Sequence, residues 1–215
     1  QILGRGAAVG NLAQQLHGRT PGSIEVLRPL SSGVITDYRL CEAMLRYFFR
    51  KAFRQRWWLR PRVLVAVPGG ISPVEQRALF TSVLRAGARQ VYLLEAGLAA
   101  ALGAGLPLAE PVAQMVVVIG AGTTEAVVLS LGDTVASQSQ PGGGDCWDEA
   151  IVAHLRRRHN LRVSSSTAER LRIALASAAP GADSRQAEVR GVDAHSGLPK
   201  KLPVTAGEIR QALDE

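Results

Sequence analysis

The sequence contains little cysteine and histidine, and it has no long apolar run. Its 215 residues include two cysteines, Cys41 and Cys146, and four scattered histidines. Two thiols are too few for a disulfide framework, and neither residue type has the spacing of a metal site. No apolar run approaches the roughly 18 residues of a membrane-spanning helix, and Gln1 does not open an export signal. These absences predict a cytoplasmic protein with reduced thiols and no bound zinc.

Basic residues outnumber acidic ones. Lysine and arginine total 25 against 18 aspartates and glutamates, which gives a net charge of +7 and a pI near 10.2. A positive net charge favours an anionic partner, such as nucleic acid, a nucleotide or an acidic membrane surface. Charge alone does not choose among these three.

A glycine-rich corner at residues 120–124, with the sequence Gly-Ala-Gly-Thr-Thr, separates two apolar runs that are each long enough for a buried strand. The backbone must turn sharply here, where only small side chains stand. Successive N–H groups in such a turn can form an anion-binding concavity, and the hydroxyls of Thr123 and Thr124 can add hydrogen bonds. The corner predicts a phosphate-binding hairpin. A tight hairpin without a ligand is the alternative, because one glycine-rich turn is a weak pattern.

Strands and helices alternate before this corner. Residues 63–67 form a continuous apolar run, typical of a strand buried on both faces, and a capping box at Ser72 and Glu75 opens the next helix. Residues 91–95 predict another strand, and residues 97–105 a helix. This order predicts an α/β fold with βαβ units and a sheet covered on both sides.

After the corner, a second glycine-rich turn at residues 141–145 precedes a helix, and its backbone could hold phosphate by the same logic. A capping box at Ser166 and Glu169 predicts the start of a further helix that runs to about Ala178. Two short strands and a last helix complete the pattern.

Large apolar side chains lie among arginines at residues 54–62. Trp57, Trp58 and Leu59 lie on a loop that Pro61 ends. Two adjacent tryptophans on an extended loop cannot both face one core. Indoles partition into the lipid headgroup region while arginines meet phosphates, so the loop predicts a membrane contact. Burial of one indole and stacking on single-stranded nucleic acid are the alternatives.

Short motifs in one order along essentially the whole chain carry a family resemblance. They are RPL at 28–30, GVITDY at 33–38, RPRV at 60–63, GAGTTE at 120–125, GGD at 143–145, DEAI at 148–151, TAER at 167–170 and GLPK at 197–200. Together they resemble the MreB rod-shape-determining family of bacterial actin homologues. The resemblance implies an actin-like ATPase fold, in which two ribonuclease-H-like halves surround an ATP–magnesium cleft. It further implies polymerisation on the inner membrane, where the filaments guide cell-wall synthesis.

The resemblance also assigns roles to residues. The second phosphate loop would contain Gly120, Ala121, Gly122, Thr123 and Thr124. The adenosine site would contain Glu169, Arg170, Leu171 and Arg172, where the family usually has lysine in place of Arg172. Trp57, Trp58 and Leu59 fall where the family has a membrane-inserting loop. The implied cofactors are ATP and Mg²⁺, and the implied partners are further copies of the protein, inner-membrane lipid and cell-wall elongation proteins rather than nucleic acid.

Two positions depart from the family pattern. Val118 stands where the family has an aspartate that helps to hold magnesium, and Ala96 stands where it has the glutamate that orients the attacking water. Phosphoryl transfer to water depends on both kinds of group, so we expect weak or absent ATP hydrolysis and assign no catalytic residue. Glu95 is adjacent to Ala96, but neighbouring positions on a strand face opposite sides.

We expect residues 1–111 to belong to a first actin-like half and residues 112–215 to a second. In the first half, 1–30 would form a small subdomain and 31–111 a core. In the second, 112–146 would form core hairpins and 147–210 a small subdomain. The first phosphate loop and the last adenosine loop have no counterpart in the sequence, so we expect a fold that is incomplete at both ends.

The favoured reading is a cytoplasmic, membrane-associated filament subunit or modulator in cell-shape determination. An active ATP-dependent phosphotransferase of the same superfold is one alternative, although no motif supplies a carboxylate for a sugar hydroxyl. A basic nucleic-acid-binding module is another, and it rests on net charge and on Trp57 and Trp58 alone.

Overall fold

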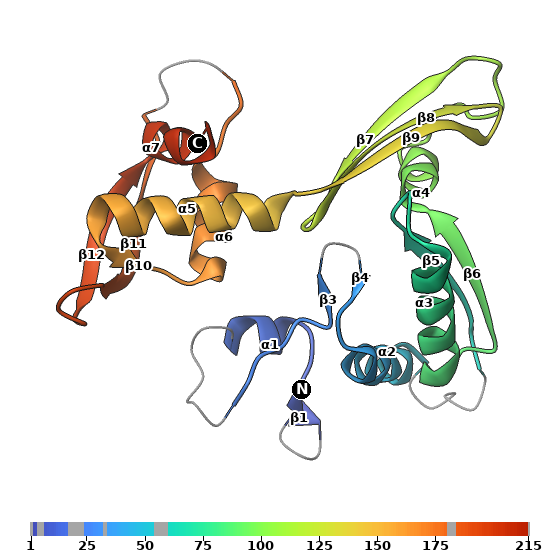
Figure 1. Cartoon of the computed structure of the whole chain (residues 1–215), viewed down its shortest axis with the longest axis horizontal. Coiled ribbons are helices and arrows are strands. Elements are labelled where there is room, and N and C mark those ends of the chain that lie inside the picture. Colours follow the sequence, from blue (N-terminus) through green and yellow to red (C-terminus); the bar gives the residue numbers. More distant parts are fainter. Residues whose placement is uncertain are drawn as a thin grey trace. The chain divides into compact units, whose positions relative to one another are not determined.

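The computed structural model describes residues 2–3, 7–16, 24–31, 34–53, 60–179 and 184–214. The chain divides into two compact units, of which one combines Gln1–Val26 with Gly144–Glu215 and the other is Leu27–Gly143 (Figure 1). The boundary expected at residue 111 falls inside the second unit. The division into two actin-like halves therefore stays a prediction.

The first part of the Leu27–Gly143 unit is a βαβ element. Strands β5 and β6 are parallel and in register from Arg62 opposite Gln90 to Val67 opposite Glu95. The capping box that opens α3 is confirmed, because Ser72 and Glu75 exchange side-chain and backbone hydrogen bonds. Gly87, with φ of 122°, ends this helix. The elements here are β3 (Leu30–Ser31), β4 (Val34–Ile35), α2 (Tyr38–Phe53), β5 (Arg62–Val67), α3 (Pro73–Ala86), β6 (Gln90–Glu95) and α4 (Ala96–Gly103).

One face of the β5–β6 pair is open, contrary to the prediction of a sheet covered on both sides. Leu64 is 63% exposed and Tyr92 is 46% exposed, and both lie on the face away from α3. Val63 and Val91 on the other face pack in a core with Val83 of α3. The continuous apolar run predicted burial on both faces, but no described element covers the outer one.

The second part of this unit is an antiparallel sheet of β7 (Gln114–Ile119), β8 (Thr123–Ser130) and β9 (Asp133–Pro141). Helix α4 packs on one face of it through a core of Ala101, Leu108, Val127 and Leu129. A Cβ atom on Gly97 would overlap the side chain of Val127, so the helix approaches β8 as closely as a glycine allows. This packing fixes the start of α4 against the strand that leaves the corner.

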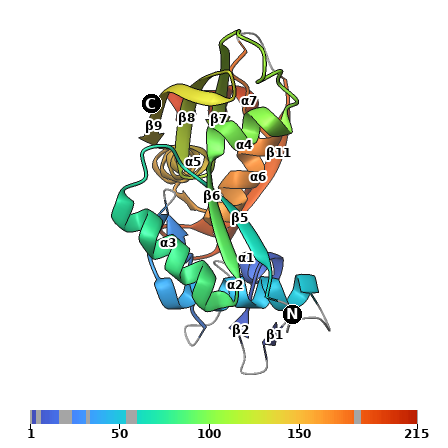
Figure 2. The same cartoon turned by 90° about the vertical axis from the view of Figure 1, so that its right-hand side faces the viewer.

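The other unit contains a three-stranded antiparallel sheet in the order β10–β11–β12, and three helices pack against it (Figure 2). Ile151, Leu155, Leu171, Val189 and Ile209 are among the residues of its hydrophobic core. The elements are α5 (Gly144–His159), β10 (Leu161–Arg162), α6 (Ser165–Leu175), β11 (Gln186–Asp193), β12 (Pro199–Thr205) and α7 (Ala206–Asp214), with β1 (Ile2–Leu3), β2 (Ala7–Ala8) and α1 (Asn11–Leu16) in the same unit.

The predicted start of α6 is wrong by two residues. Ser164, not Ser166, is the N-cap, and its hydroxyl accepts a hydrogen bond from the Thr167 N–H at 3.3 Å. The helix ends at Leu175 rather than near Ala178. Glu169 therefore lies beyond the third helical position and takes no part in a capping box.

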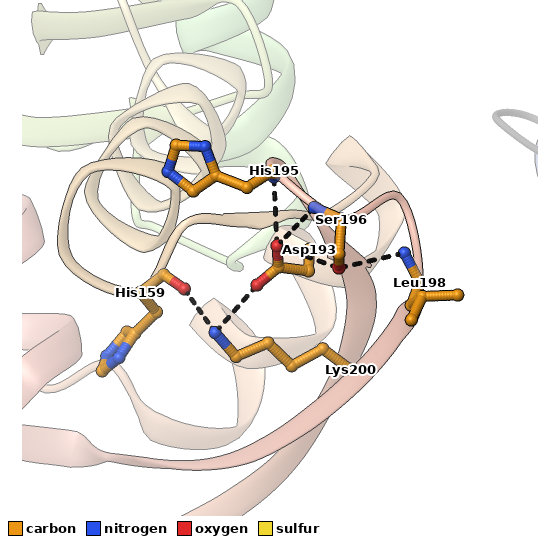
Figure 3. Close-up of polar contacts among 6 residues, drawn as sticks. All are labelled: His159, Asp193, His195, Ser196, Leu198 and Lys200. Atoms are coloured by element: carbon orange, nitrogen blue, oxygen red, sulfur yellow. Dashed lines mark hydrogen bonds and ion pairs between the residues drawn. The ribbon is translucent and has the colours of Figure 1, made fainter.

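A network of hydrogen bonds fixes the turn between β11 and β12 (Figure 3). The Asp193 carboxylate accepts bonds from the backbone N–H groups of His195 and Ser196, each at 3.0 Å. Lys200 donates to Asp193 at 3.2 Å and to the carbonyl of His159, the last residue of α5, at 2.8 Å. The bond to the Ser196 N–H, followed by Lys200, holds the pKa of Asp193 well below its ordinary value.

No helix of the described residues is long and apolar enough to cross a membrane.

Candidate nucleotide-binding site

The predicted phosphate corner is a tight antiparallel turn in the Leu27–Gly143 unit. Ile119 pairs with Thr124 across the turn, and the Gly120 N–H donates to the carbonyl of Thr123 at 2.8 Å. Gly120 and Ala121 are exposed, whereas Gly122 is half-buried. The corner thus presents backbone rather than side chains to its surroundings.

The end of β9 lies against this corner, and the two glycine-rich turns of the sequence form one backbone cluster. The Gly142 N–H donates to the Gly122 carbonyl at 2.9 Å, and the Thr124 hydroxyl donates to the Gly142 carbonyl at 2.9 Å. A Cβ atom on Gly143 would overlap the carbonyl oxygen of Gly120. Only glycine fits at that position, because the two backbones are in contact.

Three backbone N–H groups of the cluster are available to a ligand. Within the described part of the chain, those of Ala121, Gly122 and Gly143 donate to no protein acceptor. Neighbouring free N–H groups of this kind bind anions. Of the two predicted hydroxyls, that of Thr124 already donates to Gly142, whereas that of Thr123 makes no hydrogen bond with the described residues. The fit to a phosphate therefore depends on backbone and on Thr123.

A hollow of about 370 Å³ opens beside the corner. Thr123 and Pro141 line it from the hairpin, Gly69 and Gly70 line it from the loop after β5, and Ser137 and Ser139 line it from β9. All these residues belong to the same compact unit. The hollow gives an anion room at the corner without displacing any part of the core.

Glu125, which follows the corner on β8, is a further residue of this site that the sequence did not predict. Glu125 is only 3% exposed, and its Oε1 accepts a hydrogen bond from the Gly69 N–H. This bond ties β8 to the loop after β5, next to the hollow. The period of the strand could have revealed it, since residue 125 shares the buried face with Val127 and Leu129 and an acid there needs a partner.

The two positions that depart from the family pattern lie on β7 and at the start of α4. Val118 is half-buried on β7 and pairs with Glu125, and Ala96 is the first residue of α4. Glu95 accepts a hydrogen bond from the Thr134 hydroxyl at 2.7 Å. Thr134 precedes Pro141 by seven residues on β9, roughly 20 Å along a strand, so the Glu95 carboxylate is directed away from the corner.

The predicted adenosine residues lie on α6, in the unit that contains Gly144–Glu215. Leu171 is buried in the core, and Arg170 is exposed on the side of Thr167. Arg172 donates to Asp148 on α5 at 2.7 Å. The four residues therefore face different surroundings, and only Glu169 and Arg172 share a side.

Asp148 and Trp147 hold the Arg172 side chain. The guanidinium carbon lies 5.8 Å from the centre of the Trp147 ring, and the hydrogen bond that Arg172 donates to the Asp148 carboxylate raises the pKa of Arg172. A Cβ atom on Gly144 would lie 3.0 Å from a guanidinium nitrogen. Arg172 thus covers the first turn of α5, and an adenosine contact would have to involve its exposed edge.

The predicted membrane residues Trp57, Trp58 and Leu59 lie outside the described residues. The described residues on either side of them, at the end of α2 and before β5, line a basic hollow of about 310 Å³ together with the end of α3. Its lining includes Arg46, Arg50, Arg60 and Arg85 together with Phe49 and Phe53.

A sequence profile described as MreB/Mbl protein matches residues 4–215. The chain is 45% identical over 210 residues to the cell shape-determining protein MreB of Escherichia coli (strain K12), which is 97% of the chain and 60% of that protein. It is 41% identical over 212 residues to the cell shape-determining protein Mbl of Bacillus cereus (strain ATCC 10987 / NRS 248), which is 99% of the chain and 64% of that protein. The chain therefore spans about three fifths of the length of these relatives.

The chain is also similar to solved structures. MreB5 of Spiroplasma citri bound to ADP has a TM-score of 0.89 at 32% identity, over 97% of the chain and 63% of MreB5. The AMPPNP complex of the same protein has a TM-score of 0.88, over 96% of the chain and 62% of MreB5. The MamK double helical filament has a TM-score of 0.68 at 18% identity, over 88% of the chain and 57% of MamK, and this likeness concerns the fold alone.

Proposed function

Because the chain belongs to the MreB/Mbl family and has the predicted actin-like α/β fold, we propose that the protein acts in cell-shape determination. It would do so as a cytoskeletal filament subunit or as a modulator of such filaments. The observation that carries the proposal is the likeness, over almost the whole chain, to proteins named for determining cell shape. The proposed partner in the filament is a further copy of the same protein. Proteins of cell-wall elongation are proposed partners by the same resemblance.

The second element of the proposal is nucleotide binding at the corner. MreB5 was solved with ADP and with AMPPNP. The free N–H groups of Ala121, Gly122 and Gly143 suit the negative oxygens of a nucleotide phosphate, and the Thr123 hydroxyl can donate one further bond. Glu169 and Arg172 remain candidates for the adenosine. Bound Mg²⁺ would neutralise phosphate charge, but the side chain of Val118 offers it no oxygen ligand.

The third element is weak or absent hydrolysis. Ala96 and Val118 carry no group that can orient water or hold a metal-bound water, and Glu95 is engaged by Thr134 on the far part of β9. Two carboxylates of the described residues lie near the corner, and both are already engaged. Glu125 on β8 accepts the Gly69 N–H from its buried position, and Glu75, which lines the hollow, accepts hydrogen bonds from Ser72 at the start of α3. The site is therefore built to hold phosphate without efficient cleavage.

The fourth element is contact with the inner face of the membrane. Arg46, Arg50, Arg60 and Arg85 lie around the described ends of the segment that contains Trp57 and Trp58. Arginines beside an aromatic loop combine attraction to anionic lipid with insertion of apolar groups. Liposome co-sedimentation tests this element: replacing both tryptophans by alanine should abolish lipid binding, and unchanged binding would contradict it.

Polymerisation tests the main proposal. The full-length protein should form sedimentable filaments, visible by negative-stain electron microscopy, and ATP or AMPPNP should promote them to a similar extent. Gly143→Val should weaken this nucleotide effect, because its side chain would collide with the carbonyl oxygen of Gly120. Gly103→Ala on α4, where an added Cβ atom meets open space and the backbone is helical, is the matched control. A protein that stays monomeric with and without nucleotide would contradict a filament subunit.

A further inference from the structure

A groove beside α6 has no role in the proposed function. It has a volume of about 890 Å³ and lies between α6 and the edge of β11, which are neighbours in Figure 2. Thr167, Arg170, Leu171 and Ala174 line it from the helix at three- and four-residue spacing, so they form one face of α6. Residues 187–192 of β11 line the opposite side.

The edge of β11 in this groove lacks a neighbouring strand over most of its length. On one side β11 pairs with β12 from Gln186 to Val192. On the other side β10 pairs only with Val192 and Asp193, and no further strand of the described residues continues the sheet. Alternate residues of an antiparallel strand direct their N–H and C=O groups to each side, so the groove contains unpaired backbone groups.

The groove is positively charged. Arg162, Arg170 and Arg190 line it with one acid, Glu188, so three positive charges and one negative charge leave +2. Glu188 is also approached by Lys201 at 3.8 Å, in addition to Arg190 at 3.1 Å. Arg162 makes no side-chain hydrogen bond or ion pair with the described residues. Its guanidinium is therefore available to a carboxylate.

We propose that this groove binds an acidic segment of another protein, which lies extended along β11 as an added strand next to β10. Backbone hydrogen bonds to β11 would supply affinity. The arginines would select carboxylate side chains on the segment, and the exposed side chains of Ala174 and Val192 would contact its apolar side chains. A nucleic acid fits less well, because no aromatic side chain lines the groove for bases to stack on.

Peptide binding to the full-length protein tests the proposal. The probe is a fluorescein-labelled octapeptide of alternating valine and glutamate, followed by fluorescence anisotropy. We expect saturable binding of this peptide, and no binding of the same peptide N-methylated at alternate residues, which cannot pair with a strand edge. A version with lysine in place of glutamate should not bind either. Equal binding of the methylated peptide, or no saturable binding of the acidic one, would overturn the proposal.

Charge-reversal variants locate the binding. Arg162→Glu combined with Arg190→Glu should weaken the acidic peptide at least about tenfold, because repulsion replaces two charge-assisted contacts. Arg156→Glu combined with Arg77→Glu makes the same change of charge on exposed arginines outside the groove and should stay within about twofold. Circular dichroism melting verifies that both variants are folded. Equal weakening by the two variants would overturn the proposal, as would displacement of the peptide by an equally charged oligodeoxythymidine at lower concentration.

Discussion

Gly97 at the start of α4 lies so close to Val127 of β8 that a Cβ atom on the glycine would overlap the valine side chain. Val127 is 1% exposed and belongs to the core that joins α4 to the hairpin sheet. The contact sets the distance between the helix that begins at Ala96 and the strand that begins at the phosphate corner. A larger residue at position 97 must separate the two, because neither backbone is free to move alone.

Replacing Gly97 by alanine should therefore destabilise the protein. We expect a loss of about 1–3 kcal/mol in the free energy of unfolding, as for other overpacked cores. Gly103→Ala in the same helix is the matched control, because a Cβ atom there meets no other atom within 4 Å and alanine favours a helix. Urea unfolding of both variants measures the difference. Equal effects would contradict the close packing of α4 on β8.

Glu125 should hold the loop after β5 in place. Its replacement by alanine leaves the Gly69 N–H without its acceptor, at a cost of about 1–3 kcal/mol in unfolding free energy. Glu125→Gln keeps an acceptor oxygen and should lose clearly less. Amide exchange at Gly69, followed by NMR, reports the bond directly and should accelerate in the alanine variant. Glu110→Ala, at an exposed turn, controls for the loss of a charge; unchanged exchange at Gly69 would refute the assignment.

The Asp193 network should make the protein sensitive to acid. The pKa of Asp193 is lowered in the fold, so the folded state keeps this carboxylate ionised at a pH where the unfolded chain binds a proton. Its contribution to stability is complete above the ordinary aspartate pKa of 3.8 and is lost as the pH falls below it. The melting temperature of the wild type should fall more steeply from pH 5 to pH 3 than that of Asp193→Asn.

Restoring the two missing carboxylates should increase catalysis. Ala96→Glu combined with Val118→Asp supplies a group to orient water and a group for the metal shell, so steady-state phosphate release should rise at least about tenfold. Leu102→Glu combined with Val135→Asp places the same groups at exposed positions elsewhere in the unit and should have no such effect. A rise in the control variant alone, or no rise in either, would show that the two family positions do not limit the rate.

Local sequence patterns predicted a helix start correctly where neighbouring residues all favour the same start. The capping box at Ser72 and Glu75 is present because proline, serine and glutamate at those positions all favour the same helix start. Three consecutive serines precede α6, and each could cap the helix. Ser164 is the N-cap and not Ser166, because the Ser164 hydroxyl accepts the Thr167 N–H. Spacing to an acid was therefore insufficient to place the cap.

Contacts between distant residues could not be predicted from the sequence. Glu125 binds Gly69, 56 residues away, and their meeting depends on how the hairpin packs against the βαβ element. The contact of Gly143 with Gly120 depends on the register of β8 and β9, which shifts at a bulge between Val128 and Leu129. The sequence contained both glycine-rich turns, but only this register brings their backbones together.

A single-turnover assay tests the central claim that the corner holds nucleotide without efficient cleavage. Radiolabelled ATP is mixed with an excess of the full-length protein, and the label retained on a filter is separated into ATP and ADP over time. Our account predicts that nucleotide is retained and stays largely as ATP, whereas an MreB that has both family carboxylates converts it in parallel. Conversion at the rate of that reference, or no retained nucleotide at all, would contradict it.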